Sequence, residues 1–366
     1  MQRIQSGMFI MPFHYNDKPL AQTLQEDLEL IVKAEELGFS EFWIGEHHAI
    51  TCEFMMPEIF IGRALGATSR IRLGPAPLCL PQHHPARAAN QLAFLDHLSK
   101  GRLNIAFGPG SAACDIEMFG LDPKEGGAMA TEAMDMILAL WSGDPPYEIE
   151  GKYWSISIKK NIDHITTFGQ LCKPYQQPHP PIALPGTSRN SPTMALAGRR
   201  GFEAIAHCIV PGNVVADMWQ TYARGAETAG REAERSKFKV ARAMFLADTT
   251  AEAQRIARSN SLGKNFNYIT RVFDQGQGRK VFKRDLDMPD AECGQDYLFN
   301  EQVIAGDPDE ALRRLLQLIE ETGPFGTLIL MSYDWDDKAS WIRSMELFSQ
   351  ELMPALNKAV GGATAA

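Results

Sequence analysis

Short apolar runs alternate with amphipathic segments along most of the chain. Buried parallel strands produce such runs, whereas apolar residues at helical spacing, such as Leu24, Leu28 and Ile31, indicate helices packed on one face. The pattern predicts strands at 8–13, 42–45, 71–80, 102–107, 181–184, 202–207, 239–246 and 326–331. It predicts helices at 20–37, 57–68, 85–99, 131–141, 191–198, 214–229, 250–259, 307–322 and 338–356.

Two stretches interrupt the alternation. Residues 144–180 suggest a hairpin around Gly151-Lys152 followed by a polar loop, and residues 265–300 read as irregular. Eight strands separated by helices predict an α/β fold, a (β/α)8 TIM barrel with insertions after strands 4 and 7. We therefore expect residues 1–366 to form a single domain. A doubly wound sheet is the alternative, although no GxGxxG follows the first strand.

Composition limits the kinds of partner and the cellular compartment that we expect for this protein. The 366 residues are 45% hydrophobic and carry a net charge of −9, so a phosphate-backbone partner is not expected. No apolar window reaches the roughly 20 residues of a membrane helix. The start of the chain lacks a signal-peptide pattern, and the six cysteines are far apart in sequence. These features predict a cytoplasmic protein without disulfides or a membrane anchor.

Six of the nine histidines follow predicted strand ends, which form one mouth in a barrel. They are His14, His47, His48, His83, His84 and His207. His47 is the first candidate for catalysis, and the adjacent Glu46 could orient its ring. The alternative is that these are ordinary loop imidazoles. A metal site is not expected, because strand neighbours point oppositely and the two His-His pairs cannot easily both face one ion.

The segment 186–193 follows the fifth predicted strand and begins a helix. Ser191 can cap that helix with Pro192 in its first turn, which leaves backbone N–H groups and a positive helix end for an anion such as a cofactor phosphate. A plain strand-to-helix turn is the alternative. The sequence Gly108-Pro109-Gly110 permits a flat ring to approach the backbone closely, or it forms a tight turn.

Several spaced motifs are similar to those of the bacterial luciferase-like flavin monooxygenases, and in particular to the limonene and diketocamphane monooxygenase branch. The likeness covers nearly the whole chain. Its motifs are Glu46-His47-His48, Leu73-Gly74, Leu80-Pro81, His84-Pro85, Leu95 to Arg102, Phe119 to Asp122, Gly151 to Trp154, Asn190-Ser191-Pro192, Leu196-Ala197-Gly198 and Gly326-Thr327-Leu328.

The resemblance implies a two-component monooxygenase. Reduced FMN (FMNH2) would come from a separate NAD(P)H:flavin reductase and react with O2 to form a C4a-peroxyflavin. That species would oxygenate a small apolar compound, such as a cyclic or carbonyl-bearing one. His47 matches the family's catalytic histidine. The implied cofactor-binding residues are Ala76, Gly108, Gly110, Ser188, Asn190, Ser191 and Thr193.

The resemblance also implies a homodimer, and it leaves two alternatives. One is an oxidoreductase that uses the deazaflavin F420, and the other is a non-catalytic flavin-binding partner subunit. The chain departs from the luciferase pattern at Pro109, where the family carries a phosphate-binding arginine, and Arg189 is the candidate replacement. Residues 265–300, with Phe266 and Tyr268, could cover the site, since the chemistry requires water to be excluded.

Overall fold

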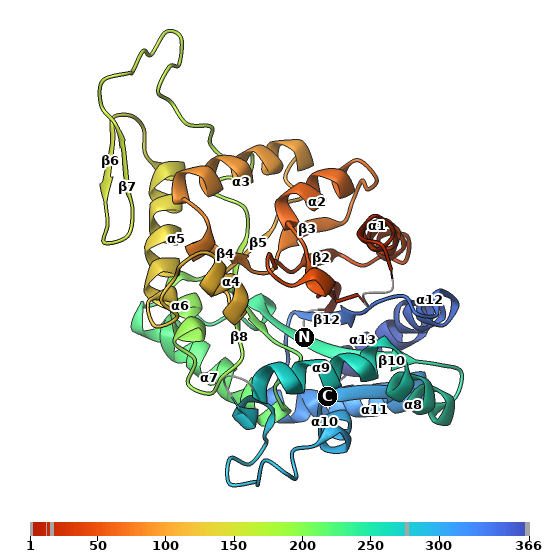
Figure 1. The fold of residues 1–366 in the computed structure, drawn as a ribbon. Coiled ribbons are helices and arrows are strands. Elements are labelled where there is room, and N and C mark those ends of the chain that lie inside the picture. Colours follow the sequence, from red (N-terminus) through yellow and green to blue (C-terminus); the bar gives the residue numbers. More distant parts are fainter. Residues whose placement is uncertain (1–2, 12, 15–17, 275–277, 363–366) are drawn as a thin grey trace. The chain divides into compact units, whose positions relative to one another are not determined.

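The computed structural model describes residues 3–11, 13–14, 18–274 and 278–362. Parts of three predicted segments therefore lie outside the described residues: residues 1–2 at the chain start, Pro12 in the strand 8–13, and 275–277 in the stretch 265–300. The chain divides into two compact units, of which the first contains 1–43 and 184–366 and the second contains 44–183. Figure 1 shows the helices and strands of both units.

The first unit is built on parallel strands. Strand β1 pairs with β12, β12 pairs with β10, and β10 also pairs with β9 and β11. Every residue of β10 is buried, as expected of a strand covered on both faces. The strands of this unit are β1 (Gln5–Ile10), β2 (Glu41–Ile44, whose last residue opens the second unit), β9 (Glu203–Ala206), β10 (Phe238–Leu246), β11 (Val303–Gly306), β12 (Thr327–Ser332) and the last three residues of β8 (Ile182–Gly186).

Helices of the first unit begin at recognisable caps. The Asp307 carboxylate accepts the Glu310 N–H at 2.9 Å, and Pro308 occupies the first turn of α11. The helices are α1 (Leu20–Glu36), α6 (Pro192–Arg200), α7 (Gly212–Thr228), α8 (Thr250–Ser259), α9 (Ser261–Asp274), α10 (Gln295–Gln302), α11 (Pro308–Thr322), α12 (Lys338–Leu347) and α13 (Met353–Gly362).

The second unit combines short parallel strands with helices and a hairpin. Strand β4 pairs with β5, and β5 pairs with the first two residues of β8. The strands are β3 (Arg72–Pro75), β4 (Leu78–Cys79), β5 (Ile105–Gly108) and the antiparallel pair β6 (Tyr147–Glu150) and β7 (Ser155–Ile158). The helices are α2 (Pro57–Leu65), α3 (Pro85–Ser99), α4 (Ala113–Met118) and α5 (Gly126–Ser142).

The strand and helix order predicted from the sequence is largely confirmed, including the hairpin and the bounds of α3. Two predictions are wrong. The strand 71–80 divides into β3 and β4, because Pro75 and Pro77 have no N–H to donate to a ladder. The prediction of irregular structure fails at both ends of 265–300, where α9 runs to Asp274 and α10 begins at Gln295, and it holds for 283–294. Phe266, buried on α9, continues a helical spacing that starts at Leu262. Helix α4 and strand β11 were not predicted.

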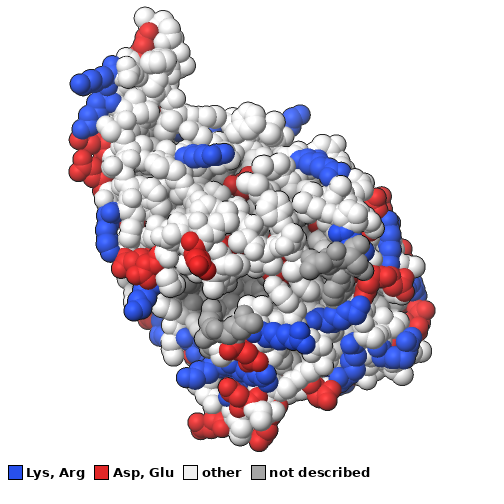
Figure 2. All heavy atoms as spheres, viewed as in Figure 1, with Lys and Arg blue, Asp and Glu red and all other residues white. Residues whose placement is uncertain are grey.

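On the face drawn in Figure 2, basic and acidic side chains lie beside one another. In the structure, Lys159, just beyond β7, pairs with Glu148 of β6, and Lys152 of the hairpin turn pairs with Glu125, which precedes α5. Within the described part of the chain, no helix has the length and apolarity needed to cross a bilayer.

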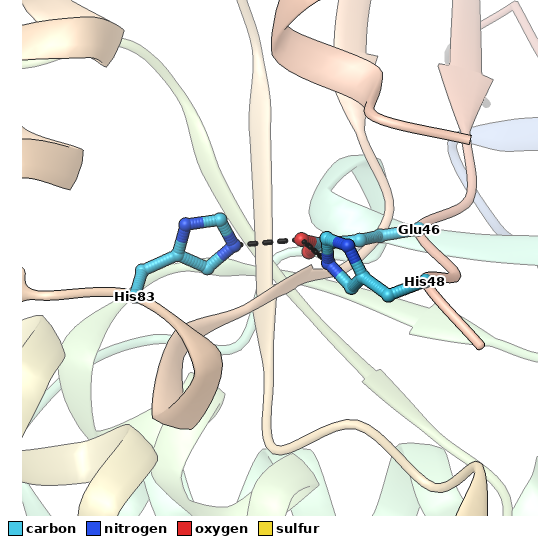
Figure 3. A group of neighbouring side chains, drawn as sticks. All are labelled: Glu46, His48 and His83. Carbon is cyan, nitrogen blue, oxygen red and sulfur yellow. Dashed lines mark hydrogen bonds and ion pairs between the residues drawn. The ribbon is translucent and has the colours of Figure 1, made fainter. Parts of the chain in front are cut away.

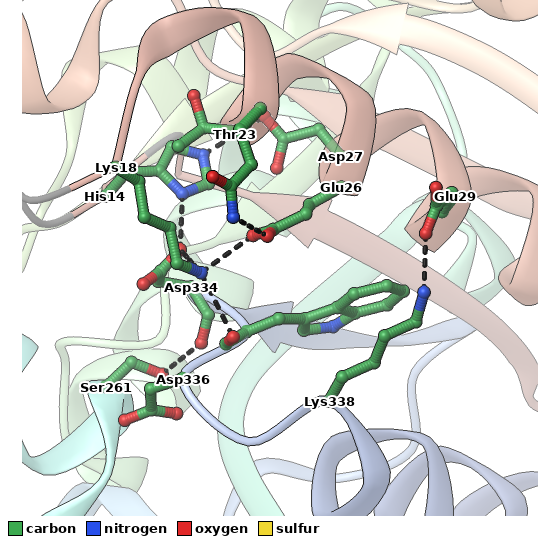
Figure 4. A network of polar contacts seen from close by, with 12 residues as sticks. His14, Lys18, Thr23, Glu26, Asp27, Glu29, Ser261, Asp334, Asp336 and Lys338 are labelled. Carbon is green, nitrogen blue, oxygen red and sulfur yellow. Dashed lines mark hydrogen bonds and ion pairs between the residues drawn. The ribbon is translucent and has the colours of Figure 1, made fainter.

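A buried histidine joins three elements of the first unit (Figure 4). The Nδ1 atom of His14, beyond β1, lies 2.7 Å from Asp334, and its Nε2 atom lies 3.1 Å from Asp27 of α1. Lys18 reaches Asp334 at 3.0 Å and Glu26 at 2.7 Å. Burial alone would lower the pKa of His14, but its hydrogen bonds to the two aspartate carboxylates outweigh burial and raise the pKa to about 9.

This network predicts a pH-dependent contribution to stability. Because the folded pKa of His14 lies above its unfolded value of about 6.5, the contribution is complete below pH 6.5 and is lost as the pH rises toward 9. We expect His14→Gln to cost on the order of 2–3 kcal/mol at pH 6 and much less above pH 9, measured by urea unfolding across pH. The exposed His164→Gln is the control. A cost independent of pH would contradict a charged His14.

Candidate active site

Three ionisable residues, Glu46, His47 and His48, follow β2 at the start of the second unit. The backbone then turns back on itself. The N–H of His47 donates to the Met55 carbonyl at 3.2 Å, and the N–H of Met55 donates to the His47 carbonyl at 3.0 Å. This antiparallel bridge fixes the backbone beneath the His47 ring.

His47 is held by a carboxylate from α4. The Oδ2 atom of Asp115 lies 3.1 Å from His47 Nδ1, while its Oδ1 atom accepts the N–H groups of His48 at 3.1 Å and Ala49 at 2.6 Å. Burial would raise the pKa of Asp115, but the hydrogen bonds from His47 and Ala49 outweigh it and lower the pKa. An ionised Asp115 selects the tautomer with a proton on Nδ1, which leaves Nε2 free to accept one.

The Nε2 atom of His47 lies near a second carboxylate. Glu53 Oε2 is 3.8 Å away, too far for a direct hydrogen bond, and its side chain is 7% exposed. The two carboxylates therefore lie beside different nitrogens of the same ring. The arrangement of carboxylate, imidazole and an open ring nitrogen is one that can hold and transfer a proton.

Glu46 does not contact His47, so the expectation that it orients that ring is wrong. Its Oε1 atom lies 2.8 Å from His48 Nε2 and 2.7 Å from His83 Nε2, and its Oε2 atom accepts the Cys79 N–H at 2.6 Å. The physical reason is the alternation of side chains in extended backbone, which points Glu46 and His48 to one side and His47 to the other.

These contacts shift the charges of the cluster. Burial alone would raise the pKa of Glu46, but the hydrogen bonds from His48 and His83 outweigh it and lower the pKa to about 2. The hydrogen bond to Glu46 raises the pKa of His48. Burial opposes the same effect at His83, yet the pKa of His83 is still raised. The Glu46 carboxylate is therefore ionised at neutral pH, and its charge favours the protonated form of both imidazoles.

The remaining strand-end histidines have other surroundings. His84 caps α3 by accepting the Ala86 N–H at 3.3 Å. His14 and His207 belong to the first unit, where burial lowers the pKa of His207 to about 4. Of the six histidines, the structure thus brings His48 and His83 to one carboxylate, Glu46, while the ring of His47 pairs with Asp115.

The segment predicted to bind a phosphate lies in the first unit. Ser191 is buried, and its Oγ accepts the Met194 N–H at 3.3 Å, so it is the N-cap of α6 as expected. Asn190 has a φ of 47°, a left-handed conformation that asparagine tolerates and that turns the loop sharply into the helix. Ser188 is exposed and Thr193 is half-buried, so both hydroxyls remain accessible beside the helix start.

Not every N–H group of this turn is free. The N–H of Asn190 donates to Asp217 Oδ2 at 2.6 Å, which places a carboxylate beside the turn. The candidate phosphate contact Arg189 points elsewhere, because its Nη2 donates to the carbonyls of Lys283 at 3.2 Å and Arg284 at 2.8 Å. The hydroxyls of Ser188, Ser191 and Thr193 and the start of α6 still form a donor set suited to a phosphate.

The other predicted cofactor residues lie in the second unit. Gly108 ends β5 and pairs with Cys79 of β4, and Ala76 is buried with its N–H donating to the Ile44 carbonyl at 2.8 Å. Gly110 has a φ of 75°, and a Cβ there would meet Gln82 at 3.2 Å and Cys79 at 3.3 Å. Only glycine fits that position without strain.

Sequence reasoning missed two carboxylates of the site, Asp115 and Glu53. Asp115 lies on a helix of six residues that was not predicted, yet it follows the fourth predicted strand and so meets the criterion that selected the histidines. Applying that criterion to acidic residues would have found it. Glu53 lies in a short turn, Thr51–Glu53, that offers no comparable signal.

Comparison with known proteins shows the family of the chain. Residues 4–324 match the family described as luciferase-like monooxygenase. The 4-hydroxyprotoasukamycin monooxygenase of Streptomyces nodosus subsp. asukaensis is 30% identical, covering 100% of this chain and 95% of that protein. Limonene 1,2-monooxygenase of Rhodococcus erythropolis is 29% identical, covering 98% and 88%.

A solved structure shows the same fold. It is the oxygenating constituent of 3,6-diketocamphane monooxygenase from Pseudomonas putida in complex with FMN, described as a type II Baeyer-Villiger monooxygenase. It is 27% identical, covers 96% of this chain and 99% of its own, and superposes with a TM-score of 0.88. The predicted α/β barrel class is thereby confirmed, as a nearly closed parallel barrel, whereas the predicted insertion positions stay a prediction. The chain belongs to the luciferase-like monooxygenase family and is a flavin-dependent monooxygenase, an oxidoreductase.

Proposed function

We propose that the protein is the oxygenase component of a two-component system that uses reduced FMN and O2 to oxygenate a small apolar, cyclic or carbonyl-bearing compound. The observation that carries this proposal is the His47–Asp115 pair, an oriented imidazole with an open nitrogen at the end of β2. The limonene and diketocamphane monooxygenases, at 29% and 27% identity, support the substrate class.

Reduced FMN, when bound, supplies the electrons that activate dioxygen. The contributions of the chain's own residues are binding and proton transfer. We assign the phosphate to Ser188, Asn190, Ser191 and Thr193 at the start of α6, and Ala76, Gly108 and Gly110 keep their predicted role as cofactor contacts. His47 holds or moves the proton through Nε2, while Asp115 fixes its ring.

Binding under anaerobic conditions tests the cofactor. We expect reduced FMN to bind more tightly than NADPH or reduced F420, because the α6 turn suits a phosphate and no dinucleotide fingerprint follows the first strand. Fluorescence titration of the purified chain measures the three dissociation constants. Tight NADPH binding with direct reduction of flavin would contradict the two-component proposal, and a preference for reduced F420 would contradict the choice of FMN.

Removing the cap of α6 should weaken cofactor binding. Ser191→Ala deletes the hydroxyl that accepts the Met194 N–H, a loss of about 1 kcal/mol, and we expect the FMN dissociation constant to rise about fivefold or more. The matched control is Thr249→Ala, since Thr249 caps α8 by accepting the Glu252 N–H at 3.3 Å. If both variants bind FMN like the parent, the phosphate lies elsewhere.

Three broader features belong to the same proposal. A separate NAD(P)H:flavin reductase would supply the cofactor, residues 1–366 would form one domain, and the chain would work as a homodimer. Exposed apolar side chains on α2 and α3, namely Ile59, Phe94 and Leu98, support a contact between copies. Light scattering tests the dimer, and a monomeric mass would contradict it. The free thiols of the exposed Cys114 and Cys172 favour a reducing compartment such as the cytoplasm.

A further inference from the structure

We propose that Glu46, His48 and His83 form a binding site for a divalent transition-metal ion, with Zn²⁺ as the best fit. Figure 3 shows the two imidazoles approaching the same carboxylate from different segments of the second unit. One ligand atom from each residue lies within 4.8 Å of the other two. His48 follows β2, and His83 lies between β4 and α3.

The donor set is one that such ions prefer. Two imidazole nitrogens and one carboxylate oxygen bind Zn²⁺ in catalytic sites, which leaves a fourth position for water, and imidazole also suits Fe, Ni and Cu. Mg²⁺ and Ca²⁺ prefer oxygen ligands and fit less well. Tetrahedral bonds of about 2.0–2.1 Å place ligand atoms about 3.3 Å apart. The separations of Glu46 Oε1 from the two imidazole nitrogens, 2.8 and 2.7 Å, therefore need to widen by about half an ångström, and the two nitrogens lie within 4.8 Å of each other.

The surrounding residues hold the three ligands in place. The Cys79 N–H donates to Glu46 Oε2 at 2.6 Å, so Oε1 remains directed at the imidazoles. The Oε1 atom of Glu58 lies 3.8 Å from His83 Nδ1, on the side of the ring away from Glu46. The ring of Phe119 meets the His48 ring edge to face at 5.1 Å. Carboxylates behind ligand histidines and fixed ring orientations are typical of built metal sites.

Burial adds to the case. The Glu46 side chain is 0% exposed, and those of His48 and His83 are 11% and 13% exposed. A buried carboxylate requires a compensating charge, which either an ion or protonated imidazoles can supply. The alternation of side chains along a strand prevents both members of a His-His pair from facing one ion. The proposed site takes only His48 from the first pair and only His83 from the second, so alternation does not exclude it.

The site is separate from the proposed proton-transfer group. The His47 ring faces Asp115 and Glu53, whereas the His48 and His83 rings face Glu46. Asp115 also accepts the backbone N–H of His48. The ion would join the segment after β2 to the segment before α3 and so support the backbone that carries His47. The proposal does not depend on the identity of the flavin.

Metal content tests this proposal directly. The full chain is stripped with a chelator, loaded with Zn²⁺, exchanged into metal-free buffer and assayed by mass spectrometry for bound zinc. We expect about one ion per chain, and at least ~100-fold weaker binding in His83→Gln and in Glu46→Gln, because each removes a ligand. His164→Gln, which removes an exposed histidine from the same unit, should bind like the parent.

A second readout keeps the test valid if His83→Gln does not fold. Co²⁺ bound through imidazole nitrogens in a tetrahedral site gives visible absorption bands, and the parent protein alone is sufficient for this measurement. Bands that appear at one equivalent and are lost in Glu46→Gln, which retains a hydrogen-bond acceptor of the same shape, support the site. The proposal is overturned if the parent shows no such bands and retains no more zinc than Glu46→Gln.

Discussion

Replacing Lys239 with methionine is expected to lower the free energy of unfolding by about 3–5 kcal/mol. Lys239 is buried near the start of β10, with its Nζ 2.5 Å from Glu41 and 3.3 Å from Glu203. Burial alone would lower the pKa of Lys239, but both glutamates outweigh it and raise the pKa. The methionine variant would leave the buried Glu41 carboxylate without its cation, which is the costly way to break such a pair.

Urea unfolding at pH 7 measures this effect. The matched control is Lys237→Met, because Lys237 forms an exposed pair with Glu234 at 2.8 Å and should change stability by less than about 0.5 kcal/mol. The double variant Lys239→Met/Glu41→Gln should recover part of the loss, since the amide can still accept the Trp43 ring N–H. A loss below about 1 kcal/mol for Lys239→Met would show that the charge network does not stabilise these strands.

Replacing His47 with alanine should abolish oxygenation while leaving the fold and most of the FMN affinity intact. A positioned general acid or base contributes about 10²–10⁴-fold in rate, so we expect product formation to fall by that factor. Oxygen consumption should continue, with the oxygen recovered as hydrogen peroxide. Parallel measurement of oxygen uptake, peroxide and product tests this expectation.

Asp115→Asn separates positioning from proton transfer. The amide can still accept one hydrogen bond but lacks the negative charge that selects the His47 tautomer, so we expect a loss of product formation smaller than that of His47→Ala. His164→Gln should leave product formation unchanged. Oxygenation by His47→Ala at the parent rate and with the same coupling to oxygen would show that His47 is a structural residue at the end of β2.

The regular parts of the fold were accessible from the sequence because their signals are local. Pro85 marked the start of α3, and Lys100-Gly101 marked its end. The apolar run of β10 marked a buried strand. Helix α9 was missed because it follows α8 with only Asn260 between them, and its serine, glycine and asparagine content suggested a loop. Its burial depends on neighbours that are distant in sequence.

The sequence predicted those site residues that follow the ends of predicted strands or that cap a predicted helix. The rule that chemistry collects there selected His47, His48 and His83, and the cap pattern selected Ser191. The partners depend on contacts across long sequence separations. Asp115 is 68 residues from His47, and Glu46 is 37 residues from His83, so sequence adjacency assigned Glu46 to the wrong imidazole.

Isotope labelling tests the central claim most directly. The chain is supplied with a flavin reductase, NADH, FMN and ¹⁸O₂, and is offered a panel of small cyclic ketones and terpenes. Our account predicts that at least one compound gains one labelled oxygen atom, that product formation requires both FMN and this chain, and that His47→Ala lacks it. A product that carries no label, or turnover that proceeds with reduced F420 and without dioxygen, would contradict the account.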